Sequence, residues 1–276
     1  MNGELFLVST PIGNLEDITL RAIRILKEVD IIVAEDTRHT MKLLNHLQIN
    51  KPLISFQRHS TDKKKSEIIN KLLEGKNIAL VTDAGTPGIS DPGEEIVYDA
   101  IKNNIKISPI PGACALISAI ITSGLNTSEF TFLGFLPLNK KNREKKINEI
   151  KNSKNTIILY EAPHKLKATL IDLEEILEKR EVVLAHEITK IHESFERGTV
   201  GELLKIIQEP KGEYVIVIEK NTEILNKKIE LSNLTLEEHF KYYEKIGYEK
   251  KEIIKQIAKD RKLPKNDIYK YFIEKK

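Results

Sequence analysis

The 276-residue sequence predicts an α/β protein with two α/β units and a small C-terminal helical module. Short apolar runs alternate with amphipathic segments over residues 1–124, and a second series of apolar runs occupies residues 125–222. Beyond this point the apolar residues recur only at helical spacing. Strands separated by helices require crossover connections, so the first sheet is expected to be mainly parallel. We therefore predict three domains, 1–124, 125–222 and 223–276.

The first unit starts with a buried run at 4–9, and Pro11 and Gly13 in the turn that follows stop regular structure. Asp17 is the expected N-cap of the first helix. Further strands are expected at 30–35, 53–56, 77–82 and 106–110, with helices at 37–47, 61–73, from about 93, and at 112–123. The last helix is so apolar that we expect it to be buried, either in the core or between subunits.

The second unit contains five runs with the composition of strands, at 131–136, 155–160, 181–187, 193–199 and 213–219. Its clearest helix spans residues 164–177. The third and fourth runs resemble a hairpin, so this sheet is expected to be mixed. The C-terminal module should hold three short helices, at 236–246, 250–261 and 264–272, separated at Gly247 and Pro264.

Composition excludes several classes of protein. Hydrophobic residues make up 40% and charged residues 31% of the chain, as in soluble folded proteins. A single cysteine, Cys114, excludes a disulfide scaffold, and the seven histidines show no metal-ligand spacing, so no metal is expected. The N-terminus does not resemble a signal peptide, and no apolar run approaches the ~20 residues of a membrane span. A cytoplasmic protein that is not bound to a membrane is expected.

Positive charge is concentrated in two segments, although the whole chain has a net charge of only +3. Residues 226–276 carry 14 basic and 9 acidic side chains, and residues 140–154 carry seven basic and two acidic ones. This asymmetry fits a polyanionic partner. The alternative is a lysine-rich composition, in which the same charge asymmetry arises because helices expose charged faces to solvent.

The loop VTDAGTPGISDPGEE at residues 81–95 carries the strongest functional signal. It joins an apolar strand to a helix and combines three glycines, two prolines and two aspartates. Loops with similar residues follow other strands at 9–14, 109–115 and 160–165. Ligands of open α/β sheets bind where parallel strands end, so these loops predict one pocket. Neither G-x-G-x-x-G nor G-x-x-x-x-G-K-[ST] occurs, which removes the usual support for NAD or ATP.

Eight segments resemble, in order and spacing, the ribosomal RNA small subunit methyltransferase I family: LVSTPIGNLEDITLRA, AEDTR, TDAGTPGISDPGEE, PGACA, GFLP, YEAPHK, HEITKIHE and GEYVIVIE. The resemblance covers about residues 4–220. It implies the two-domain tetrapyrrole methylase fold with a cofactor cleft between the domains. It also implies transfer of a methyl group from S-adenosylmethionine to the ribose 2′-oxygen of a cytidine in the decoding region of small-subunit (16S) ribosomal RNA. The implied partners are that RNA or the assembled small subunit, and a second copy in a homodimer.

The resemblance also implies which residues contact the methyl donor, which would lie folded between the two α/β units. A cationic sulfonium group requires acceptors rather than basic side chains, and an adenine requires apolar walls and backbone edges. The implied contacts are Pro11, Ala84, Gly85, Thr86, Ile89, Cys114, Ala115, Tyr160, Glu161, Ile188, Gly212, Glu213, Tyr214 and Val215.

A ribose 2′-hydroxyl is a weak nucleophile, so a base, or a cation that favours its alkoxide, would assist the transfer. Candidates near the expected pocket include Asp83, Glu161, His164 and Lys190. We favour Asp36, Arg38 and His59 as catalytic residues because they follow neighbouring strands. A structural ion pair between Asp36 and Arg38, and a surface or capping role for His59, are equally compatible with the sequence.

An RNA substrate requires basic residues around the mouth of the cleft. The candidates, from the two basic segments, are Lys140, Lys141, Arg143, Lys145, Lys146, Lys250, Lys251 and Lys255. The C-terminal helices are expected to form a nucleic-acid-binding module or a cap that packs on the body or on a second subunit. Two other functions stay open: methylation of a tetrapyrrole or other small molecule on the same fold, and a non-catalytic RNA-binding assembly factor.

Overall fold

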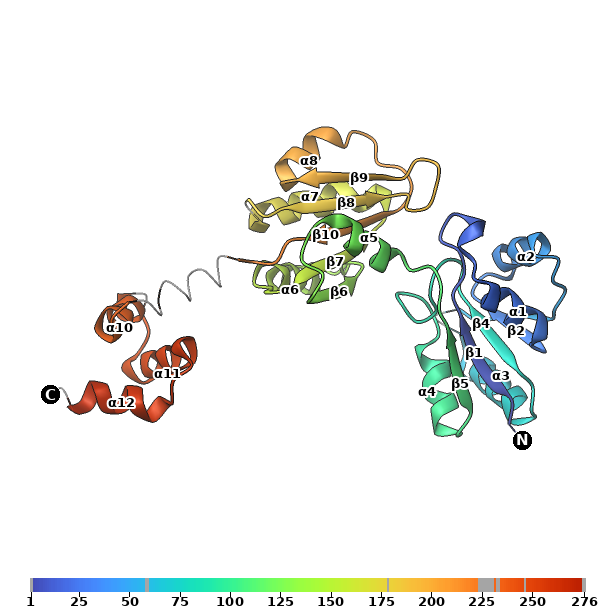
Figure 1. Cartoon of the computed structure of the whole chain (residues 1–276), viewed down its shortest axis with the longest axis horizontal. Helices are drawn as coiled ribbons and strands as arrows, with labels where there is room; N and C mark the ends of the chain where they lie inside the picture. The colour runs from blue at the N-terminus through green and yellow to red at the C-terminus, as the bar shows by residue number, and fades with distance from the viewer. Residues whose placement is uncertain are drawn as a thin grey trace.

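The computed structural model describes residues 2–57, 60–177, 179–222, 231, 234–245 and 247–274. Two five-stranded sheets and a cluster of three C-terminal helices form the described part of the chain (Figure 1). Both sheets were expected from the sequence, as was the change to a purely helical C-terminal segment.

The first sheet is parallel throughout and has the order β3-β2-β4-β1-β5. All four residues of β4 are buried, because helices cover both faces of the sheet. Parallel strands end at one edge, so the loops after β1, β4 and β5 emerge side by side. The strands are β1 (Glu4–Val8), β2 (Ile31–Ala34), β3 (Leu53–Ser55), β4 (Ile78–Val81) and β5 (Lys106–Ile110).

Two pairs of helices flank this sheet. Apolar residues of α1 (Leu20–Glu28) and α2 (Thr37–His46) pack on one face, and those of α3 (Asp62–Leu73) and α4 (Glu94–Lys102) pack on the other. The expected cap of α1 is corrected. Asp17 belongs to a short 3₁₀ helix, η1 (Leu15–Asp17), and Thr19 caps α1 by accepting a hydrogen bond from the amide of Ala22 (3.1 Å).

The second sheet is mixed, as expected, with the order β6-β7-β10-β8-β9 and one parallel pair, β6 with β7. Its helices α6 (Lys140–Lys151), α7 (Pro163–Leu177) and α8 (Val200–Ile206) pack on one face. The strands are β6 (Phe130–Gly134), β7 (Thr156–Glu161), β8 (Val182–His186), β9 (Ser194–Gly198) and β10 (Tyr214–Ile218).

Helix α5 (Ala115–Ser123) covers the other face of this second sheet (Figure 1). Leu116, Ala119 and Ile120 are buried against it, whereas Ile117 and Ile121 are 44% and 67% exposed. The expected division between residues 124 and 125 assigns this helix to the first unit. Its packing places it with the second unit, so a division between β5 and α5 follows the structure more closely.

The C-terminal helices α10 (Leu236–Lys245), α11 (Lys250–Arg261) and α12 (Lys265–Glu274) have an apolar core of their own. It contains Ile253, Ile257 and Ile268, each at most 1% exposed. Figure 1 shows these helices as a cluster apart from both sheets. Within the described ranges, no helix is long and apolar enough to cross a bilayer.

Candidate active site

Three loops meet at the carboxyl edge of the first sheet. Thr10 and Gly85 form a two-residue bridge, in which each amide donates to the other's carbonyl oxygen (2.9 and 3.1 Å). Ser9 Oγ lies 3.0 Å from Thr86 Oγ1, which donates to the carbonyl oxygen of Ala113 (3.1 Å). These hydrogen bonds therefore join three segments, as the sequence predicts: the turn after β1, the long loop after β4 and the segment after β5.

Gly85 is required at this junction for two reasons. Its φ of +84° lies in the left-handed region, where side chains other than hydrogen are strained. A Cβ atom there would lie 3.3 Å from Cγ2 of Ile12. The absence of a side chain at Gly85 thus lets the long loop after β4 approach the turn after β1.

A cavity of about 530 Å³ opens between this edge and the second unit. Its volume falls in the ~300–1,000 Å³ range typical of small-molecule sites. Both units line it, which is what the proposed donor cleft requires. Eleven of the fourteen residues predicted to contact the donor are in its wall: Ala84, Gly85, Thr86, Ile89, Cys114, Ala115, Tyr160, Glu161, Glu213, Tyr214 and Val215.

Three predicted donor contacts lie outside that wall. Pro11 lines a smaller adjoining cavity. Ile188 is 7% exposed and packs in the core between α5 and the second sheet. Gly212 has a φ of +68°, and a Cβ there would clash with the side chain of Glu187, so this glycine shapes the turn before β10.

The cleft also contains residues that the sequence did not single out as donor contacts. Ile12, Glu35, Ser90, Asp91, Phe135, Ala162 and Pro163 line it, together with Asp83 and His164. Ser90, Asp91, Ala162 and Pro163 lie within two of the loops already identified, so those loops pointed to them. Phe135 and Glu35 follow strands in other segments, and only the folded chain brings them to the cleft.

Tyr160 forms a fixed aromatic wall of the cleft. Its ring packs edge-on against Phe132 and Phe135, with centroid distances of 4.9 and 5.8 Å. The amide of Leu116, in the first turn of α5, donates to the Tyr160 hydroxyl oxygen (3.2 Å). Burial, reinforced by the nearby Cys114, raises the pKa of Tyr160, so its hydroxyl stays protonated at neutral pH. It can therefore donate a hydrogen bond to a bound ligand.

Glu161 is a buried carboxylate, 4% exposed, at the end of β7. The amide of Ala162 donates to its Oε1 (2.9 Å), and the hydroxyl of Thr169 donates to its Oε2 (2.6 Å). Thr169 Oγ1 in turn accepts a hydrogen bond from Nη2 of Arg143 (2.8 Å), and Arg143 Nε pairs with Asp172 (2.6 Å). These bonds fix the Glu161 side chain in one orientation in the cleft wall.

Arg143, which was predicted to contact RNA, takes part in this network. Its side chain is only 19% exposed, and its guanidinium group is held between α6 and α7. By contrast, Lys140, Lys141 and Lys145 are exposed on the same helix. Lys146 pairs with Glu149 (2.7 Å).

The basic residues predicted on α11 are Lys250, Lys251 and Lys255, and all three are exposed. They lie on a helix whose apolar side packs into the core of the C-terminal module. The sequence pattern therefore separated the solvent face from the core face correctly here.

Asp36 and Arg38 form the structural ion pair that the sequence left open. Asp36 is the N-cap of α2, where its carboxylate accepts from the amide of Arg38 (2.8 Å) and pairs with the guanidinium group (2.8 Å). The Arg38 side-chain and backbone hydrogen bonds lower the pKa of Asp36 to about 2. Such a weak base is poorly suited to accept a proton. Neither residue lines the cleft, and His59 lies outside the described residues.

Asp83 is the carboxylate that does face the cleft at this point. The amide of Asp36 donates to Asp83 Oδ1 (3.0 Å), so the start of α2 orients the Asp83 side chain. Of the other candidates considered, Glu161 and His164 line the cleft. Lys190 instead bridges Glu187 and Glu213 (2.8 and 3.1 Å).

Contacts at the rim join the two units. The amide of Asn14, in the first unit, donates to Oγ1 of Thr189 in the second (3.1 Å). Gly13 packs against the same segment, since a Cβ at residue 13 would lie 2.5 Å from Cγ of Lys190. The residues described contain no group of three or more His, Cys, Asp or Glu side chains that could hold a metal ion.

Comparison with known proteins places the sequence among characterised families. The family model "Tetrapyrrole (Corrin/Porphyrin) Methylases" matches residues 4–204. A ribosomal RNA small subunit methyltransferase I of Halalkalibacterium halodurans is 48% identical over 273 residues, which cover 98% of this chain and 94% of that protein. The corresponding Bacillus subtilis protein is 46% identical, with 97% and 93% coverage.

Solved structures with low sequence identity share the fold. A diphthine synthase superposes with a TM-score of 0.64 at 15% identity, covering 79% of this chain and 90% of that one. A uroporphyrin-III C-methyl transferase from Thermus thermophilus, complexed with S-adenyl homocysteine, gives a TM-score of 0.57 at 12% identity, with 80% and 100% coverage.

Proposed function

The chain belongs to the tetrapyrrole methylase family and, within it, to the ribosomal RNA small subunit methyltransferase I group, and we propose that it methylates the ribose 2′-oxygen of a cytidine in the decoding region of 16S ribosomal RNA. The methyl donor is S-adenosylmethionine. The observation that carries this proposal is the cleft of about 530 Å³ at the carboxyl edge of the first sheet, closed on its other side by the second unit.

The cleft wall suits this donor. Its charged side chains, among the described residues, are the acidic Glu35, Asp83, Asp91, Glu161 and Glu213. Carboxylates favour a sulfonium cation, whereas basic side chains would repel it. When bound, S-adenosylmethionine supplies a methyl group on a good leaving group, so positioning accounts for much of the rate.

We assign the adenine and sugar of the donor to the loop at 84–89, to Cys114 and Ala115, and to Tyr214 and Val215 of β10. Ile89 and Val215 provide apolar surface for the donor. Tyr160 closes the wall beside Phe135.

Asp83 is the residue we assign to the incoming 2′-hydroxyl. It faces the cleft and its orientation is fixed through the Asp36 amide. A carboxylate in this place accepts a hydrogen bond from the hydroxyl and aligns an oxygen lone pair with the methyl carbon. Asp36 and Arg38 then act as positioning residues, because they set the start of α2 and the amide that holds Asp83.

The substrate is a small-subunit RNA or the assembled subunit. The protein acts on it in the cytoplasm. Lys140, Lys141 and Lys145 on α6, together with Lys250, Lys251 and Lys255 on α11, provide exposed positive charge for its phosphates. We also propose a homodimer, supported by Ile117 and Ile121, which lie one turn apart on the exposed side of α5.

Calorimetric titration with S-adenosylhomocysteine tests the cleft. One site per chain is expected, and a substitution that fills the cleft, Ala84→Trp, should abolish it. Absence of binding to the wild-type protein would favour the non-catalytic RNA-binding alternative. Binding of the donor product together with methylation of a tetrapyrrole instead of RNA would favour the small-molecule alternative.

A further inference from the structure

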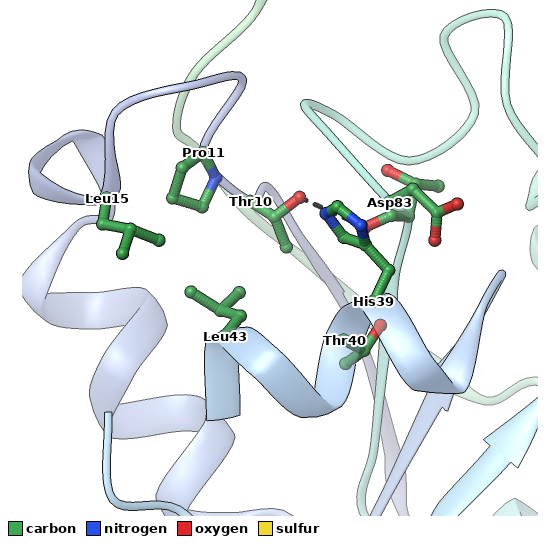
Figure 2. A pocket seen from close by; sticks show the side chains of 8 residues that line it. Thr10, Pro11, Leu15, His39, Thr40, Leu43 and Asp83 are labelled. Carbon is green, nitrogen blue, oxygen red and sulfur yellow. Dashed lines mark hydrogen bonds between the residues drawn. The ribbon is translucent and has the colours of Figure 1, made fainter. Parts of the chain in front are cut away.

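A second, smaller cavity adjoins the cleft at the same sheet edge, between the turn after β1 and the start of α2. Its volume is about 40 Å³, which is room for about three water molecules. Figure 2 shows its two sides: an apolar one formed by Pro11, Leu15 and Leu43, and a polar one formed by Thr10, His39, Thr40 and Asp83.

Thr40 is the unusual member of this lining. The residue is 3% exposed, and its hydroxyl has no hydrogen-bond partner among the described residues. A buried hydroxyl without a partner costs free energy, because it has lost its hydration without replacement. In the unliganded protein only water in the cavity is placed to satisfy this hydroxyl, and a ligand that displaces the water must supply the hydrogen bond itself. Thr10, by comparison, is satisfied, since its hydroxyl donates to the carbonyl oxygen of Thr82 (3.2 Å).

The shape and chemistry of the cavity suit the edge of a small flat ring. Pro11, Leu15 and Leu43 offer apolar surface for ring faces, and the Thr40 hydroxyl and the His39 imidazole offer hydrogen bonds to ring nitrogen and exocyclic atoms. A cavity of about 40 Å³ is closer in size to a single six-membered ring than to the two fused rings of a purine.

Asp83 lines both cavities, which fixes how they relate to each other. A nucleotide whose ribose lies at Asp83 would extend its base into the smaller cavity and direct its 2′-oxygen toward the larger one. Resting on the function proposed above, we propose that the smaller cavity is the subsite for the pyrimidine base of the methylated nucleotide, with Thr40 as its hydrogen-bonding residue. The target base must then leave its stack to enter the site.

Thr40→Val is the decisive substitution, because it keeps the shape of the side chain and removes only the hydroxyl. We expect kcat/KM for small ribosomal subunits to fall roughly 3- to 10-fold, as for loss of one neutral hydrogen bond. Affinity for S-adenosylhomocysteine should be unchanged. The midpoint of thermal unfolding should stay nearly constant, because the Thr40 hydroxyl has no hydrogen-bond partner among the described residues to lose. Thr40→Ser should restore kcat/KM, and Thr127→Val, at an exposed position between α5 and β6, is the matched control.

A second measurement changes the RNA instead of the protein. At the nucleotide that the wild-type protein methylates, uridine should be accepted in place of cytidine, and adenosine should be rejected. Unchanged kcat/KM in Thr40→Val, an equal loss of S-adenosylhomocysteine affinity, or adenosine methylated as fast as cytidine would each overturn the subsite. A wild-type protein that binds the donor and methylates no ribose would overturn the proposed function itself.

Discussion

Thr169 on α7 donates a 2.6 Å hydrogen bond to Oε2 of Glu161, the buried carboxylate in the wall of the cleft. Arg143 holds the same threonine oxygen from α6. Arg143, a residue predicted to contact RNA, therefore helps to hold Glu161 in place in the wall of the donor cleft. The lysines that surround it in sequence face solvent.

Thr169→Val should impair both stability and donor binding. The substitution leaves Oε2 of Glu161 and one guanidinium nitrogen of Arg143 without their partner, at a cost of about 1–3 kcal/mol. We expect a thermal midpoint lower by a few degrees and weaker binding of S-adenosylhomocysteine by calorimetry. Thr127→Val provides the control at an exposed position. If Thr169→Val and the control bound S-adenosylhomocysteine equally well, the network would have no role in donor binding.

Asp83→Asn should reduce methyl transfer strongly while leaving donor affinity nearly intact. Loss of a positioned proton acceptor typically lowers rates about 10²- to 10⁴-fold. Single-turnover transfer of a labelled methyl group to small subunits measures this directly. Asp17→Asn, at an exposed carboxylate in the same unit, should behave as wild type. A rate within a few-fold of wild type for Asp83→Asn would assign proton transfer elsewhere.

Asp36→Asn tests the separate role given to the neighbouring carboxylate. The pKa of Asp36 is about 2, so its folded value lies below its usual one and the carboxylate stays ionised down to about pH 3. Its contribution to stability is therefore present above its ordinary pKa of about 3.8 and is lost only as the pH falls toward 2. The pH profile of methyl transfer between pH 5 and 9 should keep its shape in Asp36→Asn. A shifted profile in that range would make Asp36 a titrating catalytic group.

Replacement of Lys140, Lys141 and Lys145 by alanine should weaken RNA binding and leave donor binding intact. Each lost phosphate contact lowers the slope of log affinity against log salt by about 0.7–0.9. The triple variant should therefore show a slope smaller by about two in filter-binding assays with small subunits. The matched control replaces Lys27, Lys63 and Lys102, exposed lysines of the first unit, and should not change the slope. Identical slopes for both triples would exclude this face of α6 from the RNA interface.

Much of the fold was readable from sequence because its determinants are local. The apolar runs that became β4 and β10 lie within one or two residues of their predicted bounds. Parallel pairing in the first sheet placed the loops after β1, β4 and β5 at one edge. The glycine- and proline-rich loop around Gly85 pointed to the cleft for the same reason, since its backbone conformation is dictated by its own residues.

What escaped prediction depends on contacts between distant segments. Arg143 sits among lysines in the sequence, and only the packing of α6 on α7 brings it to Thr169, 26 residues away. Helix α5 is apolar enough for either unit, and its partner sheet is formed by strands that come later in the chain. The unpartnered hydroxyl of Thr40 has no signature in sequence, because its significance lies in the missing hydrogen bond.

Methylation of a ribose in small-subunit RNA is tested by mapping methyl groups in 16S ribosomal RNA with mass spectrometry. Small subunits from cells that lack this protein would be incubated with the purified chain and deuterated S-adenosylmethionine. We expect a labelled methyl group on the ribose of a single cytidine in the decoding region. Label on a base, label on ribosomal protein, or no label at all would contradict it.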